Sequence, residues 1–419
     1  MHHADDHAPL IADLQPLLSD AFGGPVRCGE PTVLTLPGRR HTVMRVPLLE
    51  PRPDAAPPSV IVKQIAPQHY SENSDPEAAL KLAMLNEIIG LTFLHDRVGF
   101  RDSPGCHAGN SAAGFCAIED LGDIRCIDHT LLHGTADEAA TQLTGYARCL
   151  GRMHAMAAGQ YDAFHALRRE HGSTIAPLSA DDLAGRLGET VGRAQDLVAT
   201  VDVPLGEGTL DEMRAAMRIV ADPGPFRTYT HSDACVENAC VAPDGTIKLL
   251  DFEYGSYGHA LLDGCYARLM FPTCWCVRTL PDEVVAAIDA AYREELRAGI
   301  PAAADDAVYA RELTLACAFW VITAWVFARD RGILFQDIHH GLSTVRQRIV
   351  ARSLAFVRFS QATGELPAFA GLCQRMADGM QELWPDLPGM DTYPAFGGAP
   401  GDDDEEESEQ EPVPGEPGV

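Results

Sequence analysis

The stretch His231-Ser-Asp-Ala-Cys-Val-Glu-Asn238, followed one short hairpin later by Leu249-Leu-Asp-Phe-Glu253, decides how this chain folds. Between the two segments lies Ala-Cys-Val-Ala, then Pro243-Asp-Gly245, then Thr-Ile-Lys-Leu-Leu. This pattern predicts a strand, a tight turn with a glycine at a positive φ, and a second strand. Because a hairpin folds back on itself, we expect Asn238 and Asp251 to lie close together.

The polar residues of these two segments are those that phosphoryl transfer requires, since that chemistry depends on positioning and charge neutralisation. Asp233 follows the apolar stretch Phe226–Thr230 directly and is predicted to orient an attacking hydroxyl or to accept its proton. Asn238 and Asp251 offer one neutral and one charged oxygen, which suits Mg²⁺. His231 is interpreted as a residue that orders the loop.

An earlier lysine and glutamate form a second candidate pair. Alternation in Ile61-Val-Lys63-Gln-Ile65 places Lys63 on an apolar face, where an unpaired ammonium is costly. A helix predicted over 77–95 carries Glu87 in the same stripe as its apolar residues, namely Leu80, Met84, Leu91 and Leu94. Each charge needs a partner, and the two satisfy each other. The alternative is that Lys63 extends to water and Glu87 sits at the edge of the stripe, but the downstream motifs favour the pair.

Four regions are predicted along the chain. Residues 1–24 form an N-terminal helical segment with a helix over 9–22, and 25–119 form a β-rich lobe. That lobe has three strands, a helix over 77–95 and a short strand at 114–118. Glu119-Asp-Leu-Gly-Asp123 joins it to a mainly helical lobe, 120–394. The acidic tail 395–419 is expected to be disordered, because it cannot bury enough apolar surface to offset ordering.

The second lobe is expected to be largely helical on both sides of the motif region. Helices are predicted at 137–158, 180–200, 208–220, 283–299, 305–329, 341–361 and 368–383. Asp263 is predicted to open one further apolar helix, where capping alone could explain it; we expect it to brace the loop that holds Asp233. The predicted class is α+β, with a small β-rich lobe and a large, mainly helical lobe in the protein-kinase-like arrangement.

Composition narrows the class of partner. The formal charge is −28, of which residues 402–419 supply nine negative charges; subtracting nine from 28 leaves about −19 for the rest. A surface this acidic repels nucleic acid and attracts cationic small molecules. Acidity kept for solubility alone is an equal alternative.

Cysteine spacing and hydropathy point to a soluble, cytoplasmic protein. Twelve cysteines occur without a Cys-x-x-Cys pair, and neither Cys235…Cys240 nor Cys274-Trp-Cys276 has zinc-ligand spacing. They are expected to be buried free thiols in a reducing compartment. The N-terminus lacks the pattern of a signal peptide. The most apolar stretch, 313–328, is short for a membrane span and suits a buried helix.

These features resemble the aminoglycoside phosphotransferase and choline kinase family, a group of small-molecule kinases, over about residues 30–330. The resemblance is carried by Lys63, Glu87, Glu119–Asp123, Leu150-Gly-Arg-Met-His154, His231–Asn238, Asp251-Phe-Glu-Tyr254 and Asp263. It implies that Asp233 is the catalytic base, that Asn238 and Asp251 bind magnesium, and that Lys63 with Glu87 contacts the phosphates of ATP. The backbone near Glu119 and Leu121 would then meet the adenine.

The chain departs from the family pattern at two places. The predicted phosphate loop, Leu36-Pro-Gly-Arg-Arg-His41, has a single glycine, so Arg39 or Arg40 could substitute electrostatically. In the catalytic loop, Ala234-Cys-Val-Glu237 replaces the more common segment, and Glu237 either binds a cationic substrate or faces solvent.

The sequence therefore predicts an ATP- and Mg²⁺-dependent phosphotransferase that acts on a hydroxyl of a small molecule. Acceptors of the aminoglycoside or amino-alcohol type are favoured by the acidic surface. The alternative is a catalytically silent kinase-like protein that binds a ligand or regulates a partner. A third possibility is transfer of AMP in place of phosphate. The sequence identifies neither the acceptor nor the oligomeric state.

Overall fold

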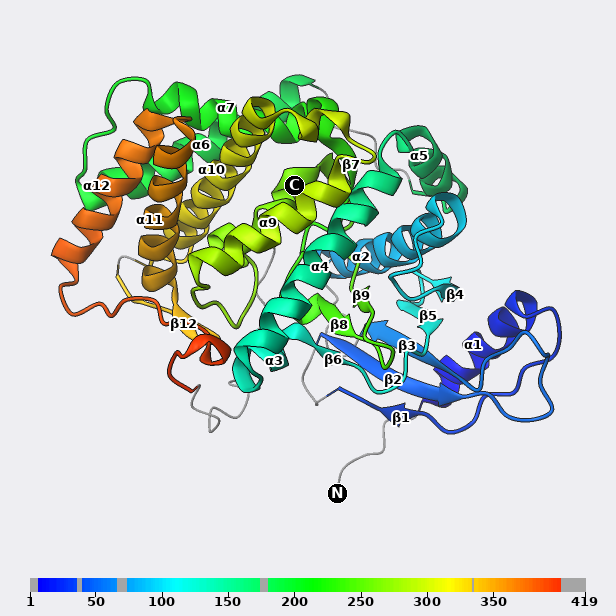
Figure 1. Ribbon diagram of the computed structural model, residues 1–419. Helices are drawn as coiled ribbons and strands as arrows, with labels where there is room; N and C mark the ends of the chain where they lie inside the picture. The colour runs from blue at the N-terminus through cyan, green and yellow to red at the C-terminus, as the bar shows by residue number, and fades with distance from the viewer. Residues whose placement is uncertain (1–6, 36–39, 66–73, 174–179, 334, 401–419) are drawn as a thin grey trace.

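The chain forms two unequal parts in a computed structural model, which describes residues 7–35, 40–65, 74–173, 180–333 and 335–400 (Figure 1). A small part built on an antiparallel sheet lies at one end and a large helical part at the other. This division confirms the predicted α+β class with a small β-rich lobe and a large, mainly helical lobe.

The small part is a five-stranded antiparallel sheet in the order β1-β2-β3-β5-β4 with two helices. Its elements are α1 (Ala8–Ala21), β1 (Thr32–Val33), β2 (His41–Pro47), β3 (Ser59–Ile65), α2 (Ser74–Thr92), η2 (Phe93–Val98), β4 (Cys106–Asn110) and β5 (Phe115–Glu119). Leu14 and Leu18 of α1 are fully buried in a core with Met44 and Val46 of β2. The predicted N-terminal helix is therefore confirmed, and it packs as part of the small lobe.

Two local differences separate the predicted strands from those observed. The first strand, predicted over 32–36, spans only Thr32–Val33, and residue 36 lies outside the described part of the chain. The strand Cys106–Asn110 was not predicted, because its sequence Cys-His-Ala-Gly-Asn has neither alternation nor β-branched residues. Pairing with β5 supplies its stability instead.

The joint that follows β5 is tied to the sheet by charged hydrogen bonds. Arg45 of β2 donates from Nε to Oδ2 of Asp120 at 2.8 Å and from a terminal nitrogen to Asp123 at 3.0 Å. The hydroxyl of Ser59 donates to Asp120 at 2.6 Å. Gly122 has φ +79°, a conformation that a glycine adopts without strain. The joint therefore keeps a fixed position relative to β2 and β3.

The large part contains most of the helices, arranged around α10 and α4 (Figure 1). Its helices are α3 (Ile127–His133), α4 (Ala136–Ala157), α5 (Tyr161–Glu170), α6 (Ala180–Val201), α7 (Thr209–Ala221), α8 (Ala260–Gly264), α9 (Asp282–Leu296), α10 (Asp306–Asp330), α11 (Val345–Thr363) and α12 (Pro367–Leu383). The strands are β6 (Arg125–Cys126), β7 (Arg227–Thr230), β8 (Ala239–Val241), β9 (Ile247–Leu249), β10 (Ser256–His259), β11 (His339–His340) and β12 (Ser343–Thr344). Short 3-10 helices are η3 (Gly224–Phe226), η4 (Val236–Asn238), η5 (Tyr266–Leu269), η6 (Pro301–Ala304) and η7 (Pro394–Phe396).

The seven predicted helices of this part correspond to α4, α6, α7, α9, α10, α11 and α12. Helix α11 begins at Val345 and not at 341, because Thr344 caps it in a box with Gln347 and the short strands β11 and β12 precede it. Helices α3 and α5 were not predicted, and the apolar helix expected to open at Asp263 is α8, in which Asp263 is the second-last residue and His259 is the N-cap. In α5 the spacing of buried Phe164 and Leu167 is helical, so a signal was present.

Helix α10 is apolar and long enough to cross a membrane by length and composition alone. However, 61% of its most apolar window is buried inside the structure, where it packs against α6, α7 and α11. It is the core helix that the sequence predicted.

Helix α2 joins the two cores. Met84 and Ile88 pack with Ile65 of the sheet, whereas Ile89 and Leu91 belong to the core of the large part. The predicted boundary near residue 119 remains a prediction, since packing across it is continuous at α2.

The expectation of free thiols is wrong for one pair, because Cys126 and Cys240 form a disulfide. Antiparallel pairing of β6 with β8 places these two residues directly opposite each other. Their separation of 114 residues hid this from the sequence pattern. The other ten cysteines are free.

The predicted start of the disordered tail at 395 is also wrong for its first residues. Tyr393 is fully buried, Ala395 is 9% exposed, and Arg278 donates to the carbonyl of Ala399 at 2.6 Å. Residues up to 400 therefore pack against the helical part, held by backbone contacts that composition does not reveal. Residues 401–419 lie outside the described part of the chain.

Candidate active site

The hairpin predicted between the two motif segments is confirmed. Strands β8 and β9 pair antiparallel, and Gly245 in the turn has φ +83°. Beyond the last strand pair, the Leu250 amide donates to the carbonyl of Asn238 at 2.8 Å. Leu250 is the residue before Asp251, so this bond brings Asp251 next to Asn238 and the two motif segments meet.

The Asp233 carboxylate is held by three donors. Nδ2 of Asn238 donates to Oδ2 at 3.0 Å, the Thr273 hydroxyl donates to Oδ1 at 2.5 Å, and the Cys235 thiol lies 3.3 Å from Oδ1. Because Nδ2 of Asn238 makes this contact, its Oδ1 takes no part in it. The arrangement fixes the orientation of the Asp233 carboxylate.

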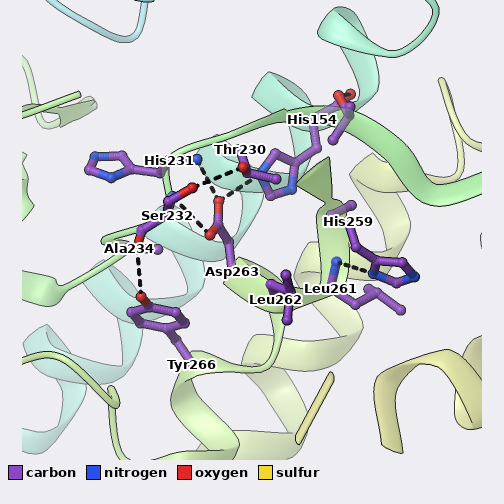
Figure 2. Close-up of polar contacts among 12 residues, drawn as sticks. His154, Thr230, His231, Ser232, Ala234, His259, Leu261, Leu262, Asp263 and Tyr266 are labelled. Atoms are coloured by element: carbon purple, nitrogen blue, oxygen red, sulfur yellow. Dashed lines mark hydrogen bonds and ion pairs between the residues drawn. The ribbon is translucent and has the colours of Figure 1, made fainter. Parts of the chain in front are cut away.

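The loop before Asp233 is anchored by a buried aspartate (Figure 2). The Asp263 carboxylate accepts the amide of His231 at 2.6 Å and the amide of Ser232 at 3.0 Å. His154 of α4 completes its shell at 3.1 Å. Asp263 is 1% exposed, so these bonds replace the water that a buried carboxylate would otherwise lack. This is the bracing contact expected from the sequence.

Two non-glycine residues beside the site adopt positive φ angles. Ser232 has φ +66° and Asp251 has φ +64°. Such angles are costly for residues with a Cβ and concentrate at functional sites. The His231 ring links the segments, since Nε2 lies 2.8 Å from the carbonyl of Leu250 and the ring packs on Phe252. His231 therefore orders both segments, as expected.

Lys63 lies among three carboxylates. Its Nζ is 3.4 Å from Glu87, 2.5 Å from Asp251 and 3.5 Å from Glu253, and the residue is only 8% exposed. The contact with Glu87 that the sequence predicted is present. Asp251 comes from the large lobe, so the lysine also links the two lobes.

The charged side chains around Lys63 shift one another's pKa values. Burial alone would lower the pKa of Lys63, but Asp251, Glu87 and Glu253 together raise it well above its ordinary value. Burial raises the pKa of Glu87 to about 8 against the opposing charge of Lys63. Burial would raise the pKa of Asp251 too, yet the charge and hydrogen bond of Lys63 hold it well below its usual range. One ammonium cannot neutralise three carboxylates, so Asp251 keeps its charge and Glu87 tends to bind a proton.

Glu253 was quoted in the motif without a role, and the structure gives it one. It is 2% exposed and forms an ion pair with Arg40, the described end of the predicted phosphate loop. Arg40 also donates to the Tyr254 hydroxyl at 3.1 Å. Arg39 and the glycine of that loop lie outside the described residues. The signal for Glu253 was its place two residues after Asp251.

Glu237 lies close to both predicted catalytic carboxylates. Burial, with the charges of Asp233, Asp128 and Asp251, raises the pKa of Glu237 to about 8. The residue is partly exposed and not fully solvated as one alternative held.

A loop from the helical part, missed in the sequence, completes the site. Thr273 and Cys274 are held in place by two buried arginines of α11. Arg348 donates to the carbonyl of Cys274 at 2.9 Å, and Arg352 donates to the carbonyl of Pro272 at 2.8 Å. No sequence signal connects residues this far apart, because the contact exists only after α11 packs.

Replacing Thr273 with valine is expected to reduce turnover about 10-fold and to lower the free energy of unfolding by at most about 3 kcal/mol. The exchange keeps shape but removes a 2.5 Å donor to Asp233, and bonds to charged groups contribute about 1.5–3 kcal/mol. Steady-state kinetics should show the change in kcat and not in KM for ATP. Thr273→Ser keeps the hydroxyl and should retain most activity; equal losses in both variants would contradict the positioning role.

His340, beside the same arginines, predicts a pH effect on stability. Burial and the charges of Arg348, Arg352 and Arg331 lower the pKa of His340 to about 4. Between about pH 6.5 and 4 the unfolded chain binds a proton that the folded chain does not, so stability falls as the pH falls through this window. His340→Asn should remove about 1–2 kcal/mol of that loss after allowance for partial exposure. Urea unfolding at pH 7 and pH 5 measures it; parallel loss in both proteins would refute it.

The predicted adenine contacts, Glu119 and Leu121, lie at the joint. The Glu119 amide donates to the carbonyl of Gly105 at 2.8 Å, and its carboxylate accepts the Gly105 amide at 3.2 Å. The Glu119 side chain is exposed and Leu121 is partly buried. Their role in nucleotide binding remains a prediction.

A cavity of about 410 Å³ lies between η5, α9 and α11. Its lining includes Met270, Leu354 and Phe359 but neither Asp233 nor Thr273. It is therefore not assigned to the reaction.

Comparison with known proteins finds similarity of structure only. No protein-family model matches the chain, and no curated protein sequence matches it. Choline kinase LicA from Streptococcus pneumoniae is 13% identical, with 84% of this chain and 99% of that chain covered and a TM-score of 0.40. An ethanolamine kinase from Plasmodium vivax is 10% identical (84% and 83% covered, TM-score 0.44). Macrolide 2′-phosphotransferase MphH from Brachybacterium faecium is 15% identical (76% and 93% covered, TM-score 0.43). At these values the description of this chain rests on its own topology and site.

Proposed function

We propose that this chain is an ATP-dependent kinase that transfers the γ-phosphate of ATP to a hydroxyl of a small molecule. The observation that supports it most is the meeting of two groups across the lobes. Asp233 and Asn238 are fixed on one loop, and Asp251 beside them contacts the Lys63–Glu87 pair of the small lobe. Charged groups that converge in one place with perturbed pKa values are typical of functional sites.

Asp233 is proposed to act as the base. Its carboxylate is oriented by Asn238 and Thr273, so the acceptor hydroxyl would approach a fixed oxygen. Asp263 holds the preceding backbone and thereby fixes the approach direction. Lys63, kept charged by its neighbours, is proposed to contact the phosphates, with Glu87 holding it in place.

The oxygen donors near Asp233 fit magnesium. Asp251 supplies a carboxylate that stays ionised, and Asn238 supplies its amide oxygen; both are hard ligands of the kind that Mg²⁺ prefers. When bound, Mg²⁺ would neutralise charge on the phosphates. The adenine is proposed to lie against the backbone at Glu119 and Leu121.

An amine-bearing acceptor is favoured by the acidic composition of the chain, whose formal net charge is −28. Aminoglycosides and amino alcohols are therefore the first candidates, and we place the reaction in the cytoplasm, where ATP and Mg²⁺ are supplied. No nucleic acid or membrane partner is proposed.

The test is turnover by the purified full chain with ATP and Mg²⁺ against a panel of acceptors. The panel holds choline, ethanolamine, aminoglycosides, macrolides, sugars and nucleosides. Mass spectrometry should detect one product that is heavier by a phosphoryl group. A product heavier by AMP would replace the proposal with nucleotidyl transfer, and ATP binding without any turnover would favour the silent, ligand-binding alternative.

A further inference from the structure

Three side chains with metal-ligating atoms meet beside Asp233. The sulfurs of Cys235 and Cys274 and a carboxylate oxygen of Glu237 all lie within 4.8 Å of one another. Cys235 and Glu237 come from the catalytic loop, and Cys274 comes from the loop that α11 holds. Their sequence spacing excluded a zinc motif, but the fold brings together residues that are about forty positions apart.

We propose that Cys235, Cys274 and Glu237 form a binding site for one thiophilic divalent cation such as Zn²⁺. This site is separate from the proposed magnesium ligands Asn238 and Asp251. Thiolate sulfur selects zinc-like ions, whereas Mg²⁺ takes oxygen ligands, so the two sites would not compete for one ion.

The geometry suits three protein ligands and one open position. Zn–S bonds of about 2.3 Å and Zn–O bonds of about 2.0–2.2 Å put tetrahedral ligand atoms roughly 3.4–3.8 Å apart. Ligand atoms that lie within 4.8 Å of one another must therefore move closer by about 1 Å to bind one ion. Arg348 fixes the main chain of Cys274, and Asn238 fixes the end of the other loop, so both anchors are rigid.

Burial favours a bound ion over free thiolates at this place. Cys235 is 1% exposed and Cys274 is fully buried, and a cation compensates the charge that their deprotonation creates. Glu237 is partly exposed and gives the ion a route from solvent. The buried thiols elsewhere, such as Cys373 of α12, belong to no such group within the described residues.

Occupancy would slow the proposed reaction. The Cys235 thiol lies 3.3 Å from Oδ1 of Asp233 and 2.9 Å from the Thr273 hydroxyl. A coordinated sulfur no longer donates to Asp233 and turns toward the ion, so one of the three positioning contacts is lost. This effect on turnover rests on the proposed function, but the binding of the ion does not.

Binding is tested with Cd²⁺ as a spectroscopic probe on the full chain, without ATP or Mg²⁺. Thiolate-to-cadmium absorption in the near ultraviolet should saturate at one equivalent and should be displaced by Zn²⁺. Cys235→Ser and Cys274→Ser should each weaken Cd²⁺ binding at least tenfold, whereas the control Cys373→Ser should not. Absorption that survives both single variants, or that Cys373→Ser removes, would overturn the site.

A milder variant guards against loss of folding. Glu237→Gln keeps both thiols and should retain the absorption band while weakening Cd²⁺ binding about tenfold; unchanged affinity would overturn the role of Glu237 in the site. In the turnover assay at saturating Mg²⁺, Zn²⁺ should inhibit the unaltered chain. A cadmium band in a chain that phosphorylates no acceptor would support the site and contradict the proposed function, and turnover without a band would do the reverse.

Discussion

Replacing Asp233 with asparagine is expected to lower kcat by about 10²–10⁴-fold, the range that general bases contribute. The variant keeps the size of the side chain but loses the proton acceptor. It also places an NH₂ group against either Asn238 or Thr273, both of which now donate to the carboxylate. The KM for ATP should change little, because Asp233 has no contact with Lys63 or Glu87 in the described residues.

A matched control variant tests whether the loss of one negative charge is by itself enough to lower turnover. Asp211→Asn on α7 removes the same charge from a side chain that is 87% exposed and forms an ion pair with Arg214 on the surface. It should keep full activity, since exposed ion pairs contribute little. Turnover by Asp233→Asn at the rate of the Asp211→Asn control would show that Asp233 is not the base.

The parts of the site that could be predicted from the sequence are those marked by a pattern among neighbouring residues. Period-two alternation placed Lys63 on the buried face, and helical spacing placed Glu87 opposite it; their contact at 3.4 Å follows from those two rules. The turn residues around Gly245 predicted the hairpin that joins Asn238 to Asp251. Asn238 and Asp251 are close in sequence. Lys63 and Glu87 are not, but each is a buried charge that needs a partner.

The parts that sequence could not predict depend on long-range packing. Thr273 reaches Asp233 only because Arg348 and Arg352, some 75–80 residues later, hold its loop. A lone threonine in Phe-Pro-Thr-Cys carries no pattern that marks it as a partner of a base. The Cys126–Cys240 disulfide depends in the same way on the pairing of β6 with β8.

Helix α5 is an instructive intermediate case. Buried Phe164 and Leu167 stand three residues apart, and Asp162 lies in the first turn, which favours a helix start. The signal covers only ten residues, so it is weaker than that of the longer helices that were predicted. Short helices are marginal alone and depend on tertiary contacts, here with η2.

Replacing Lys63 with methionine is expected to have the second large effect, on both stability and activity. The variant leaves Glu87, Asp251 and Glu253 without the ammonium that lies within 3.5 Å of each. Breaking a buried ion pair by removal of one partner costs about 3–5 kcal/mol. The loss of a charged group at the phosphates should lower kcat/KM for ATP by about 10²–10³-fold, comparable to removal of one stabilising donor.

The cost in stability should depend on pH in a defined direction. The pKa of Glu87 is raised from its ordinary value of 4.5 to about 8 in the folded chain. Between these two pH values the folded chain keeps a proton on Glu87 that the unfolded chain has released. A raised pKa contributes stability at low pH that is lost as the pH rises, and removal of Lys63 raises this pKa further. Lys63→Met should therefore be less stable than the unaltered chain at pH 5, where ionised Asp251 has lost its partner, and less stable still at pH 8, where Glu87 must also bind a proton or remain an unpaired charge.

Adding Glu87→Gln to Lys63→Met should restore part of the stability at pH 8, because one of the stranded carboxylates is then neutral. The double variant should not restore nucleotide binding, since the cation is still missing. Urea unfolding and ATP titration of the unaltered chain, Lys63→Met, Glu87→Gln and the double variant form a double-mutant cycle. This cycle measures the coupling between Lys63 and Glu87. Equal urea midpoints for the single and double variants at pH 8 would mean that Lys63 and Glu87 do not depend on each other, and would leave the lysine without the positioning role assigned to it.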